Sequence, residues 1–419
     1  MIRILHLGDA AARSLRAEAA MPAGVAEAVG KIVADVRARG DAAVRELTER
    51  FDHLRLDDLF LDDARWDALA ALCPLPVRQA LEVAHERVRA FHLPQVPPSY
   101  EQKLPDGGIL KCLIIPLRRA ACYVPGGRGS YPSTVIMTAT VARLAGVPEV
   151  IVATPRVAPE VAAAARIAGA TRILQVGGAH AIAALAIGTG TIPRVDVIVG
   201  PGNAYVTEAK RQLSGEVRID SLAGPTEVVI VADESADPRS AAADLIAQAE
   251  HDPLAFSVLV TPSEKLAREV AASLAPTGIA AESLKNHGAI VITRDLDEAL
   301  AFADELAPEH LELLVDDAND ALPKVPRAGA VFVGHHAPVP VGDYLAGPNH
   351  TLPTSGTARF ASPLSATDFV RRQNVIEYTP EQLKADAKHI CNLANAEGLH
   401  GHAQAIESRQ PAAGSRGPE

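Results

Sequence analysis

The sequence predicts an α/β protein with two Rossmann-like units and a helical segment at each end of the chain. Short apolar runs of strand length alternate with helical segments through residues 116–370, and glycines follow several of these runs. Such strands are apolar on both faces, which predicts parallel sheets covered by helices on both sides. Aromatic residues make up only 4% of the chain, so Val, Leu, Ile and Ala must fill the core.

Composition limits the class of protein. A chain of 419 residues with 48% apolar and 22% charged residues is expected to form two or more globular domains. A net charge of −11 argues against a nucleic-acid partner or an anionic membrane surface. No apolar run approaches the roughly 20 residues of a membrane-spanning helix. The N-terminus lacks a signal-peptide pattern, and the four cysteines show no CxxC spacing, so we expect a reducing, cytoplasmic location.

The first part of the chain, residues 1–115, is expected to be a helical segment and a strand that pack on the second α/β unit. Apolar residues recur at helical spacing through residues 22–92, for example at Ile32 and Val36. Residues 109–115 form a β-branched, apolar run that predicts a strand, and a Gly/Pro-rich loop follows Tyr123.

The first Rossmann-like domain is predicted over residues 116–224. Glycines end its expected strands at Gly177–Gly178 and at Gly200 and Gly202, where ligands of parallel sheets gather. No GxGxxG motif follows any strand, so the usual dinucleotide fingerprint is missing. These glycines either let the backbone approach a cofactor or only form tight turns. The expected strands are 149–153, 172–176 and 195–199, and the expected helices are 158–168 and 179–187.

The second Rossmann-like domain is predicted over residues 225–370. A strand followed by Thr-Pro occurs at Thr154-Pro155 and again at Thr261-Pro262, which suggests a duplication. Residues 371–408 are expected to form a helical C-terminal tail, and residues 409–419 to be disordered. The expected strands of this domain are 227–232, 256–260, 289–293, 311–315 and 330–333.

Candidate metal ligands occur in three separate patches: Gln248 with His251, then Asp343, then His402. Nitrogen and oxygen donors without thiolates suit a borderline divalent ion such as Zn²⁺. Asp237 and Pro238 are the expected start of a helix that places Gln248 and His251 on one face. The alternatives are that Gln248 only supports a ligand, and that His251 only interacts with the dipole at the helix C-terminus.

An adjacent acid–base pair, Glu309-His310, lies between the metal patches and is expected to open a strand after Pro308. The pair offers two proton-transfer groups at one place. The alternative is an exposed turn with two polar residues. Cys122 could be a thiol nucleophile, but nothing near it in the sequence supplies an activating base, so a small buried apolar role is favoured.

Dense motifs in order along residues 20–408 resemble the histidinol dehydrogenase family. They are Ile219-Asp220-Ser221-Leu222-Ala223-Gly224-Pro225-Thr226-Glu227-Val228, Gln248-Ala249-Glu250-His251, Ala307-Pro308-Glu309-His310, Gly342-Asp343-Tyr344, Gly347-Pro348-Asn349-His350 and Thr357-Ala358-Arg359-Phe360.

This resemblance implies oxidation of L-histidinol to L-histidine by two hydride transfers to NAD through a bound aldehyde, the last step of histidine biosynthesis. It implies one Zn²⁺ per subunit, His310 as general base and Glu309 as the group that activates water. The residue sets that it implies are the zinc ligands Gln248, His251, Asp343 and His402, the further substrate contacts Thr226, His310, His350 and Glu397, and the NAD contacts Tyr123, His180 and Asn203.

The resemblance also implies a homodimer in which the C-terminal tail of one subunit completes the site of the other. Two positions depart from the family pattern. His180 stands where the family has Gln, which affects NAD binding, and His400 could compete with His402 as ligand. The alternatives to this function are a related zinc- and NAD-dependent dehydrogenase of another small polar alcohol, such as a sulfonated diol, a zinc hydrolase that needs no NAD, and a catalytically inactive binding protein.

Overall fold

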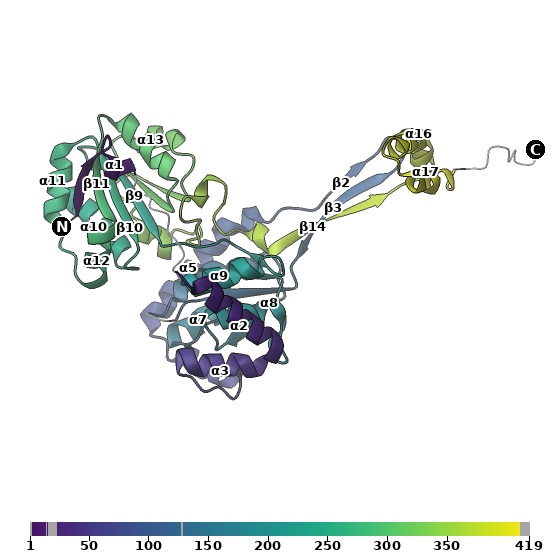
Figure 1. Cartoon of the computed structure of the whole chain (residues 1–419), viewed down its shortest axis with the longest axis horizontal. Helices are drawn as coiled ribbons and strands as arrows, with labels where there is room; N and C mark the ends of the chain where they lie inside the picture. Colours follow the sequence, from purple (N-terminus) through teal and green to yellow (C-terminus); the bar gives the residue numbers. More distant parts are fainter. Residues whose placement is uncertain (1, 14, 16–22, 127–128, 411–419) are drawn as a thin grey trace, which may run out of the picture. The chain divides into compact units, whose positions relative to one another are not determined.

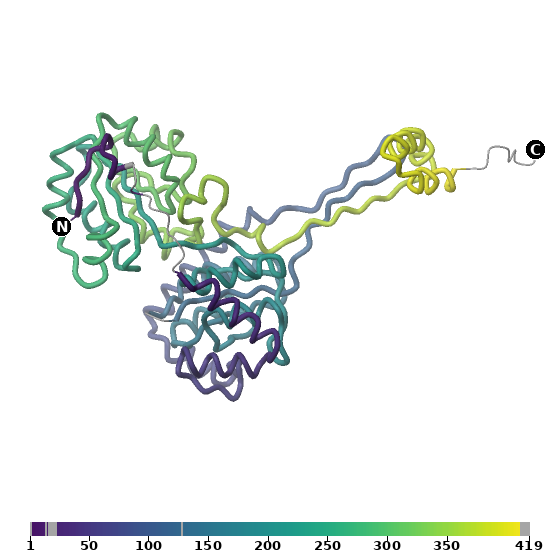
Figure 2. Tube along the Cα trace, viewed as in Figure 1, coloured from purple at the N-terminus to yellow at the C-terminus, as the bar shows by residue number. Residues whose placement is uncertain are grey.

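The computed structural model describes residues 2–13, 15, 23–126 and 129–410. The chain divides into two compact units, shown in Figures 1 and 2. Unit 1 contains Met1–Val96 and Leu117–Phe369, and unit 2 contains Pro97–Pro116 and Val370–Glu419. The predicted α/β class is confirmed, because unit 1 holds two parallel sheets with helices between their strands. The predicted disorder after residue 409 falls almost wholly on residues 411–419, which lie outside the described part of the chain.

The first sheet of unit 1 has five parallel strands in the order β6-β5-β4-β7-β8. The chain runs from central β4 outward to β5 and β6, and then returns to β7 on the other side of β4. This reversal puts a topological switch point between β4 and β7, where parallel α/β sheets usually bind ligands at their carboxyl ends. The elements are β4 Arg119–Tyr123, α6 Pro132–Leu144, β5 Glu149–Ala153, α7 Pro159–Ile167, β6 Arg172–Leu174, α8 Gly178–Ile187, β7 Val197–Val199, α9 Ala204–Leu213 and β8 Arg218–Ile219.

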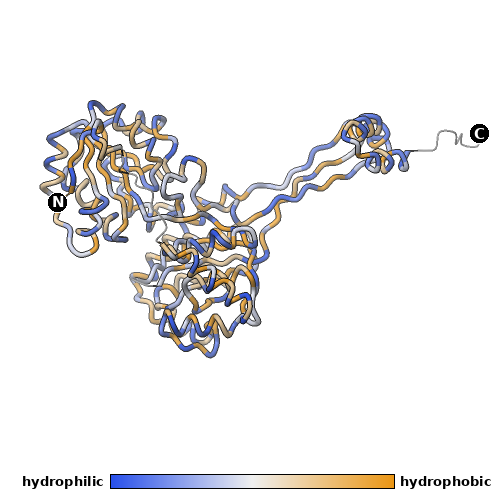
Figure 3. The backbone as a smooth tube through the Cα atoms, in the orientation of Figure 1, coloured by the Kyte–Doolittle hydropathy of each residue, from blue (hydrophilic) through white to orange (hydrophobic). Residues whose placement is uncertain are grey.

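The second sheet has six parallel strands in the order β1-β11-β10-β9-β12-β13. Its strands are buried on both faces: Val229 and Val231 of β9 pack into one core, and Val228 and Ile230 pack into the other. In Figure 3 the strands of this sheet are mostly orange, the colour of hydrophobic residues, and the helices around them carry more blue, the colour of hydrophilic residues. The elements are β1 Arg3–His6, α1 Ala10–Arg13, β9 Glu227–Ala232, α10 Pro238–Ala249, β10 Phe256–Thr261, α11 Glu264–Ser273, α12 Gly278–His287, β11 Gly288–Ile292, α13 Leu296–Leu306, β12 His310–Leu314, α14 Ala318–Ala321, β13 Ala330–Val333 and α15 Val339–Tyr344.

The N-terminal helices correct one expectation, because they pack on the first sheet's domain and not on the second. Apolar positions of α2, including Val29 and Val36, form one core with the Ala-rich helix α8 and with α9. Small alanine side chains let the helices approach closely, which explains this choice of surface. Among the described residues before 97, only β1 pairs with the second sheet, and Ala12 of α1 and Leu15 pack into its core. These helices are α2 Val25–Arg39, α3 Asp41–Asp52, α4 Asp63–Ala71 and α5 Leu75–His92, and short 3₁₀ turns in unit 1 are Leu93–Gln95, Leu322–Lys324, Thr357–Arg359 and Ala366–Phe369.

Unit 2 consists of a three-stranded antiparallel sheet and two helices. The strand predicted at residues 109–115 is found at β3 Ile109–Pro116, but it lies in this unit, between β2 Tyr100–Lys103 and β14 Val370–Glu377. The tail predicted as helical from residue 371 therefore begins with a strand, and helix α16 Pro380–Ala396 and helix α17 His400–Glu407 follow. No helix in the described ranges of the chain is long and apolar enough to cross a bilayer.

Candidate active site

The predicted catalytic pair lies at the amino ends of strands β9 and β12 in the second sheet. His310 is level with Val228 and with Ala330 on the neighbouring strands. In a parallel sheet the covering helices run antiparallel to the strands, so the last residues of α10 return to the edge where β9 and β12 begin. This arrangement brings Gln248, at the end of α10, to Thr226, which directly precedes β9. The site is thus at the edge opposite to the one at which parallel sheets usually bind ligands.

Local sequence fixes where Glu309 and His310 emerge. Helix α13 ends at Leu306, and its C-cap residue Ala307 is left-handed, with a φ of 41°. Pro308 then prevents a further helical turn. The backbone of Gly329 packs closely against that of Glu309, since a Cβ at position 329 would lie 2.7 Å from the Glu309 carbonyl oxygen. The chain therefore turns sharply into β12, and the predicted strand start is confirmed.

Glu309 is buried and doubly hydrogen-bonded. Its Oε2 accepts hydrogen bonds from Thr226 Oγ1 at 2.6 Å and from the Glu227 amide at 2.8 Å. Burial raises the pKa of Glu309, while His310 and the two hydrogen bonds oppose this shift. A carboxylate held in this way can accept a proton from a water molecule. The alternative of an exposed turn is excluded, because both side chains are more than nine-tenths buried.

His310 is held by its Nδ1 atom, which lies 2.9 Å from the carbonyl oxygen of Glu227. A carbonyl only accepts, so Nδ1 carries the proton and Nε2 of the neutral ring is free to act as a base. Nε2 is buried and has no hydrogen-bond partner among the described residues. It lies 3.9 Å from Asp343 Oδ1, so the base points toward one of the predicted ligands.

Two of the predicted zinc ligands, Gln248 and Asp343, lie beside this pair. Gln248 Nε2 donates to Thr226 Oγ1 at 2.6 Å, so the amide oxygen is the atom of Gln248 that could bind a metal. Helix α10 begins as predicted, with Asp237 as N-cap and Pro238 at the first position, and it ends at Ala249. His251 follows that end and is exposed. Burial lowers the pKa of His350, and the charge of His251 is among the smaller influences on it, so His251 lies close to the cluster.

Asp343 lies on α15, and two contacts position it. Gly342 is packed against Phe332, since a Cβ there would lie 2.7 Å from the ring. The carbonyl oxygen of Asp343 accepts a hydrogen bond from His350 Nδ1 at 2.9 Å, and His350 Nε2 lies 3.4 Å from Thr134 Oγ1. His350 thus fixes the backbone of the candidate ligand, and its role as a substrate contact stays a prediction.

The donor set fits a borderline divalent ion in its chemistry: an amide oxygen, an imidazole nitrogen and a carboxylate oxygen. Among the described residues no group of three or more His, Cys, Asp and Glu is arranged to hold a metal. In unit 1 the predicted set contains only His251 and Asp343 of those residue types, together with Gln248. The fourth predicted ligand, His402, belongs to unit 2.

His402 and Glu397 lie on the helices of unit 2. Glu397 caps the C-terminus of α16, and His402 lies in the first turn of α17; both are exposed. The competing His400 is bonded within its own segment, with Nδ1 3.1 Å from Asn395 Oδ1. This bond occupies only Nδ1, so His400 Nε2 stays available and the contact does not decide between the two histidines as ligand.

The three predicted NAD contacts all belong to the first sheet. Asn203 is exposed after β7, and its Oδ1 accepts from the amides of Tyr205 and Val206 at the start of α9. Tyr123 ends β4, and its buried hydroxyl accepts from the Gly178 amide at 3.0 Å; burial raises the pKa of Tyr123 to about 12. The switch point between β4 and β7 therefore lies between two of the predicted residues.

His180, the third predicted NAD contact, is buried. Its ring is 1% exposed, with Nε2 3.2 Å from Thr48 Oγ1 and 3.8 Å from Asp52 Oδ2, both on α3. Burial lowers the pKa of His180 to about 4. The small, apolar helix α8 turns its first residues inward, so His180 packs beside the Gly177–Gly178 turn, and its contact with NAD stays a prediction.

The glycine loops at this edge also have contacts within the protein. A Cβ at Gly200 would lie 2.2 Å from the Tyr123 carbonyl oxygen, and φ at Gly200 is +108°. Lys210 Nζ donates to the Gly200 carbonyl at 2.6 Å and to Asp220 Oδ1 at 2.7 Å, and Asp220 Oδ2 accepts from the Gly200 amide at 2.6 Å. A buried ion pair therefore clamps the loop that leads to Asn203. Cys122 is buried, and burial raises its pKa to about 12, which confirms its role as a small apolar side chain.

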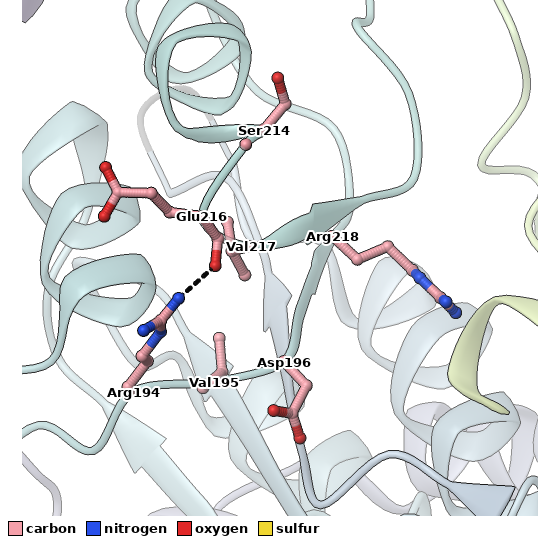
Figure 4. A pocket seen from close by; sticks show the side chains of 8 residues that line it. Arg194, Val195, Asp196, Ser214, Glu216, Val217 and Arg218 are labelled. Atoms are coloured by element: carbon pink, nitrogen blue, oxygen red, sulfur yellow. Dashed lines mark hydrogen bonds between the residues drawn. The ribbon is translucent and has the colours of Figure 1, made fainter. Parts of the chain in front are cut away.

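A shallow hollow lies at the opposite edge of the first sheet, shown in Figure 4. Arg194 there donates to the Glu216 carbonyl oxygen, which ties together the loops before β7 and β8. No predicted site residue lines it.

Sequence reasoning missed three residues of the site. Glu227 holds His310 through its carbonyl, and its carboxylate accepts from the amides of Ser355 and Glu309. Asp244 and Glu312 lie beneath the site, on α10 and β12. The sequence held a sign of both residues. Asp244 comes four positions before Gln248 and Glu312 two positions after His310, and both are acidic at positions where apolar side chains are expected.

Comparisons with known proteins show the family of this chain. A family model described as histidinol dehydrogenase matches residues 15–410. The histidinol dehydrogenase of Parasynechococcus marenigrum is 46% identical over 393 residues, covering 91% of this chain and 90% of that protein. The one from Chlorobium chlorochromatii is 47% identical over 395 residues, covering 91% and 92%. The crystal structure of histidinol dehydrogenase from Elizabethkingia anophelis matches with a TM-score of 0.90 at 29% identity, over 98% of both chains. The chain therefore belongs to the histidinol dehydrogenase family.

Proposed function

We propose that this protein oxidises L-histidinol to L-histidine through the aldehyde, with NAD as the hydride acceptor in two successive steps, at the end of histidine biosynthesis. The observation that carries the proposal is the buried Glu309-His310 pair, which Thr226 joins to the candidate ligand Gln248 in a chain of this family. We place the reaction in the cytoplasm, in keeping with four free cysteines.

The two catalytic residues divide the proton transfers. The contact of Nδ1 with the Glu227 carbonyl places the base nitrogen of the neutral ring at His310 Nε2, which accepts the proton of the substrate hydroxyl. Glu309 accepts a proton from the water that adds to the aldehyde, which the second oxidation requires. Its pKa, raised by burial, favours uptake of that proton. Glu309 is held by Thr226 and the Glu227 amide, and His310 by the Glu227 carbonyl, so a proton transfer at one side chain leaves the hydrogen bonds of the other in place.

We propose that Gln248, His251 and Asp343 of one subunit and His402 of another would hold Zn²⁺. When bound, the ion would supply two coordination positions for the imidazole and amine nitrogens of the substrate. Thr226, His350 and Glu397 are the proposed further substrate contacts. His350 is neutral in this setting, because burial lowers its pKa, so it can donate or accept a hydrogen bond without repelling a metal.

NAD is proposed to bind at the carboxyl ends of β4 and β7. Asn203 is exposed there, and Tyr123 and His180 lie beneath the loops that would meet the cofactor. The ion pair of Lys210 with Asp220 supports this proposal, because it keeps the Gly200 loop in one conformation before any ligand arrives.

We also propose the homodimer in which unit 2 completes the partner's site. Buried apolar side chains among the described residues of unit 2 are all small: Cys112, Val370, Ala394 and Ala403. Three large apolar side chains of the same unit are instead more than 60% exposed, namely Tyr100, Ile376 and Leu393. A unit with so little core needs another surface to cover it.

The test of the reaction is formation of NADH, followed by absorbance, with purified zinc-loaded protein, NAD and L-histidinol. We expect about two NADH per histidinol consumed, since two hydrides leave the substrate. His310→Ala is the inactive control, and the exposed Glu264→Gln on α11 is the matched active control. Turnover of another alcohol, such as a sulfonated diol, with none of histidinol would refute the substrate assignment.

The test of the shared site mixes two inactive variants, His310→Ala and His402→Ala, under conditions in which subunits exchange. One site of a mixed dimer would then carry both defects, and the other would carry neither. Activity should rise toward one intact site per mixed dimer. If exchange is demonstrated by mass and no activity returns, then His402 serves its own subunit.

A further inference from the structure

Two acidic side chains meet beneath the active site, on elements that carry its functional residues. Asp244 lies on α10 four residues before Gln248 and seven before His251, so the three share one face of the helix and its extension. Glu312 lies on β12 two residues after His310, so both side chains point to the same face of the sheet. That face is the one covered by α10, since Leu314 of β12 packs there with Leu245.

Glu312 is fully buried, and one of its oxygens has a backbone partner. Oε1 accepts a hydrogen bond of 2.8 Å from the amide of Val339, the first residue of α15. Helix α15 carries Asp343 one turn later. Glu312 is therefore a direct link between the strand of the catalytic base and the helix of a candidate ligand.

The second oxygen of Glu312 faces Asp244. Oε2 is buried and finds no donor among the described residues when both carboxyls are ionised. The two carboxyls are nonetheless within hydrogen-bonding distance of each other. Burial, with the negative charge of Asp244, raises the pKa of Glu312 to about 8, and burial raises the pKa of Asp244 to about 6. The polar groups that act on the pair are the two carboxyls and the Val339 amide.

Two ionised carboxylates at hydrogen-bonding distance repel each other, and Glu312 is fully buried whereas Asp244 is partly buried, so one proton between them is the stable arrangement. With that proton every polar atom of the contact has a partner: Asp244 and Glu312 share the hydrogen, and Val339 donates to Glu312. The same contact then joins α10, β12 and α15. A buried contact with all its polar groups satisfied resists displacement, because separation would leave unpaired groups without solvent.

We propose that Asp244 and Glu312 share one proton and act together as positioning residues, which fix Gln248 on α10, His251 just after it and Asp343 on α15 relative to His310 on β12. This proposal rests on the proposed function only in naming those residues as ligands and base. Neither carboxyl touches substrate; the pair acts through the elements it joins. It explains why acidic side chains occupy positions where an α/β core otherwise takes Leu or Val.

The experiment compares two substitutions of Glu312: an amide, which preserves the contact with Asp244, and an apolar residue, which cannot form it. In Glu312→Gln the amide nitrogen donates to ionised Asp244, and the amide oxygen still accepts from Val339. Glu312→Met has a similar volume and makes neither bond. Asp244→Asn tests the other partner, because its amide donates to ionised Glu312. Glu264→Gln, at an exposed position of α11, is the control.

The proton is measured on zinc-loaded protein by infrared spectroscopy, through the carbonyl stretch of a protonated carboxylic acid. We expect a band in the wild type that is missing from both Glu312→Gln and Asp244→Asn and retained in Glu264→Gln. An identical acid band in the wild type and both amide variants would overturn the shared proton. The infrared measurement does not require catalytic activity, and it does not use Glu312→Met, so it remains valid even if that variant fails to fold.

Positioning is measured by zinc affinity in competition with a chelator, and by kcat and KM for histidinol. Supporting groups behind ligands are typically worth roughly 10- to 100-fold in metal affinity. We expect Glu312→Met to weaken zinc binding by about this factor, and Glu312→Gln to restore it to near the wild-type value. Equal zinc affinity in folded Glu312→Met and the wild type would overturn the positioning role. If the infrared and zinc results hold but the wild type fails to oxidise histidinol, only the proposed function fails.

Discussion

Thr226→Val removes one hydroxyl and keeps the shape of the side chain. That hydroxyl donates to Glu309 Oε2 at 2.6 Å and accepts from Gln248 Nε2 at 2.6 Å. The substitution leaves Glu309 with the Glu227 amide as its remaining donor at Oε2 and deprives the Gln248 amide of this acceptor. It therefore tests whether Thr226 couples the candidate ligand to the candidate water-activating carboxylate.

The size of the effect follows from the charge on Glu309. A hydrogen bond to a charged group is worth about 1.5–3 kcal/mol. It stabilises the ionised form and so lowers the pKa, as found for the Thr226 contact. Its loss should raise the pKa of Glu309 by about one to two units, since one unit corresponds to about 1.4 kcal/mol. A base with a raised pKa is protonated, and inactive, up to a higher pH.

The assay is the pH dependence of kcat with the aldehyde as substrate, which isolates the second oxidation. The acid limb of the Thr226→Val profile should move upward by about one to two pH units, and activity should approach the wild-type value well above it. Thr226→Ser keeps the hydroxyl and should keep the wild-type profile. If Thr226 only contacts substrate, KM rises in Thr226→Val and the acid limb does not move, which would refute the coupling.

His310→Ala should slow alcohol oxidation by about 10² to 10⁴, whereas Glu309→Gln should slow aldehyde oxidation more than alcohol oxidation; rates with each substrate distinguish the two. His251→Asn should lower zinc content by metal analysis and raise KM for histidinol, and full activity of a metal-free sample would contradict the zinc assignment. His180→Gln should lower Tm without changing KM for NAD, because the ring is buried against α3; a changed KM at an unchanged Tm would show direct contact. Asp220→Asn should raise KM for NAD and leave zinc content unaltered, because it breaks the buried pair that clamps the Gly200 loop; an unchanged KM would place NAD elsewhere.

Local patterns were sufficient to predict most elements and part of the site. The strand at residues 227–232 and the helix start at Asp237-Pro238 were predictable, because apolar runs and caps act over a few residues. The Glu309-His310 pair was predictable for the same reason, since Pro308 ends one element and adjacency in sequence guarantees adjacency in space.

Only the tertiary structure decided which surfaces the elements cover and what each side chain faces. Apolar periodicity shows that α2 must bury one face, but it does not choose between two similar sheets, so the N-terminal helices were assigned to the wrong one. His180 was expected to face NAD, and its burial against Thr48 depends on α3, which is more than a hundred residues away in the chain. The pairing of Asp244 with Glu312 likewise joins distant segments, because contacts between elements depend on packing geometry that no local pattern contains.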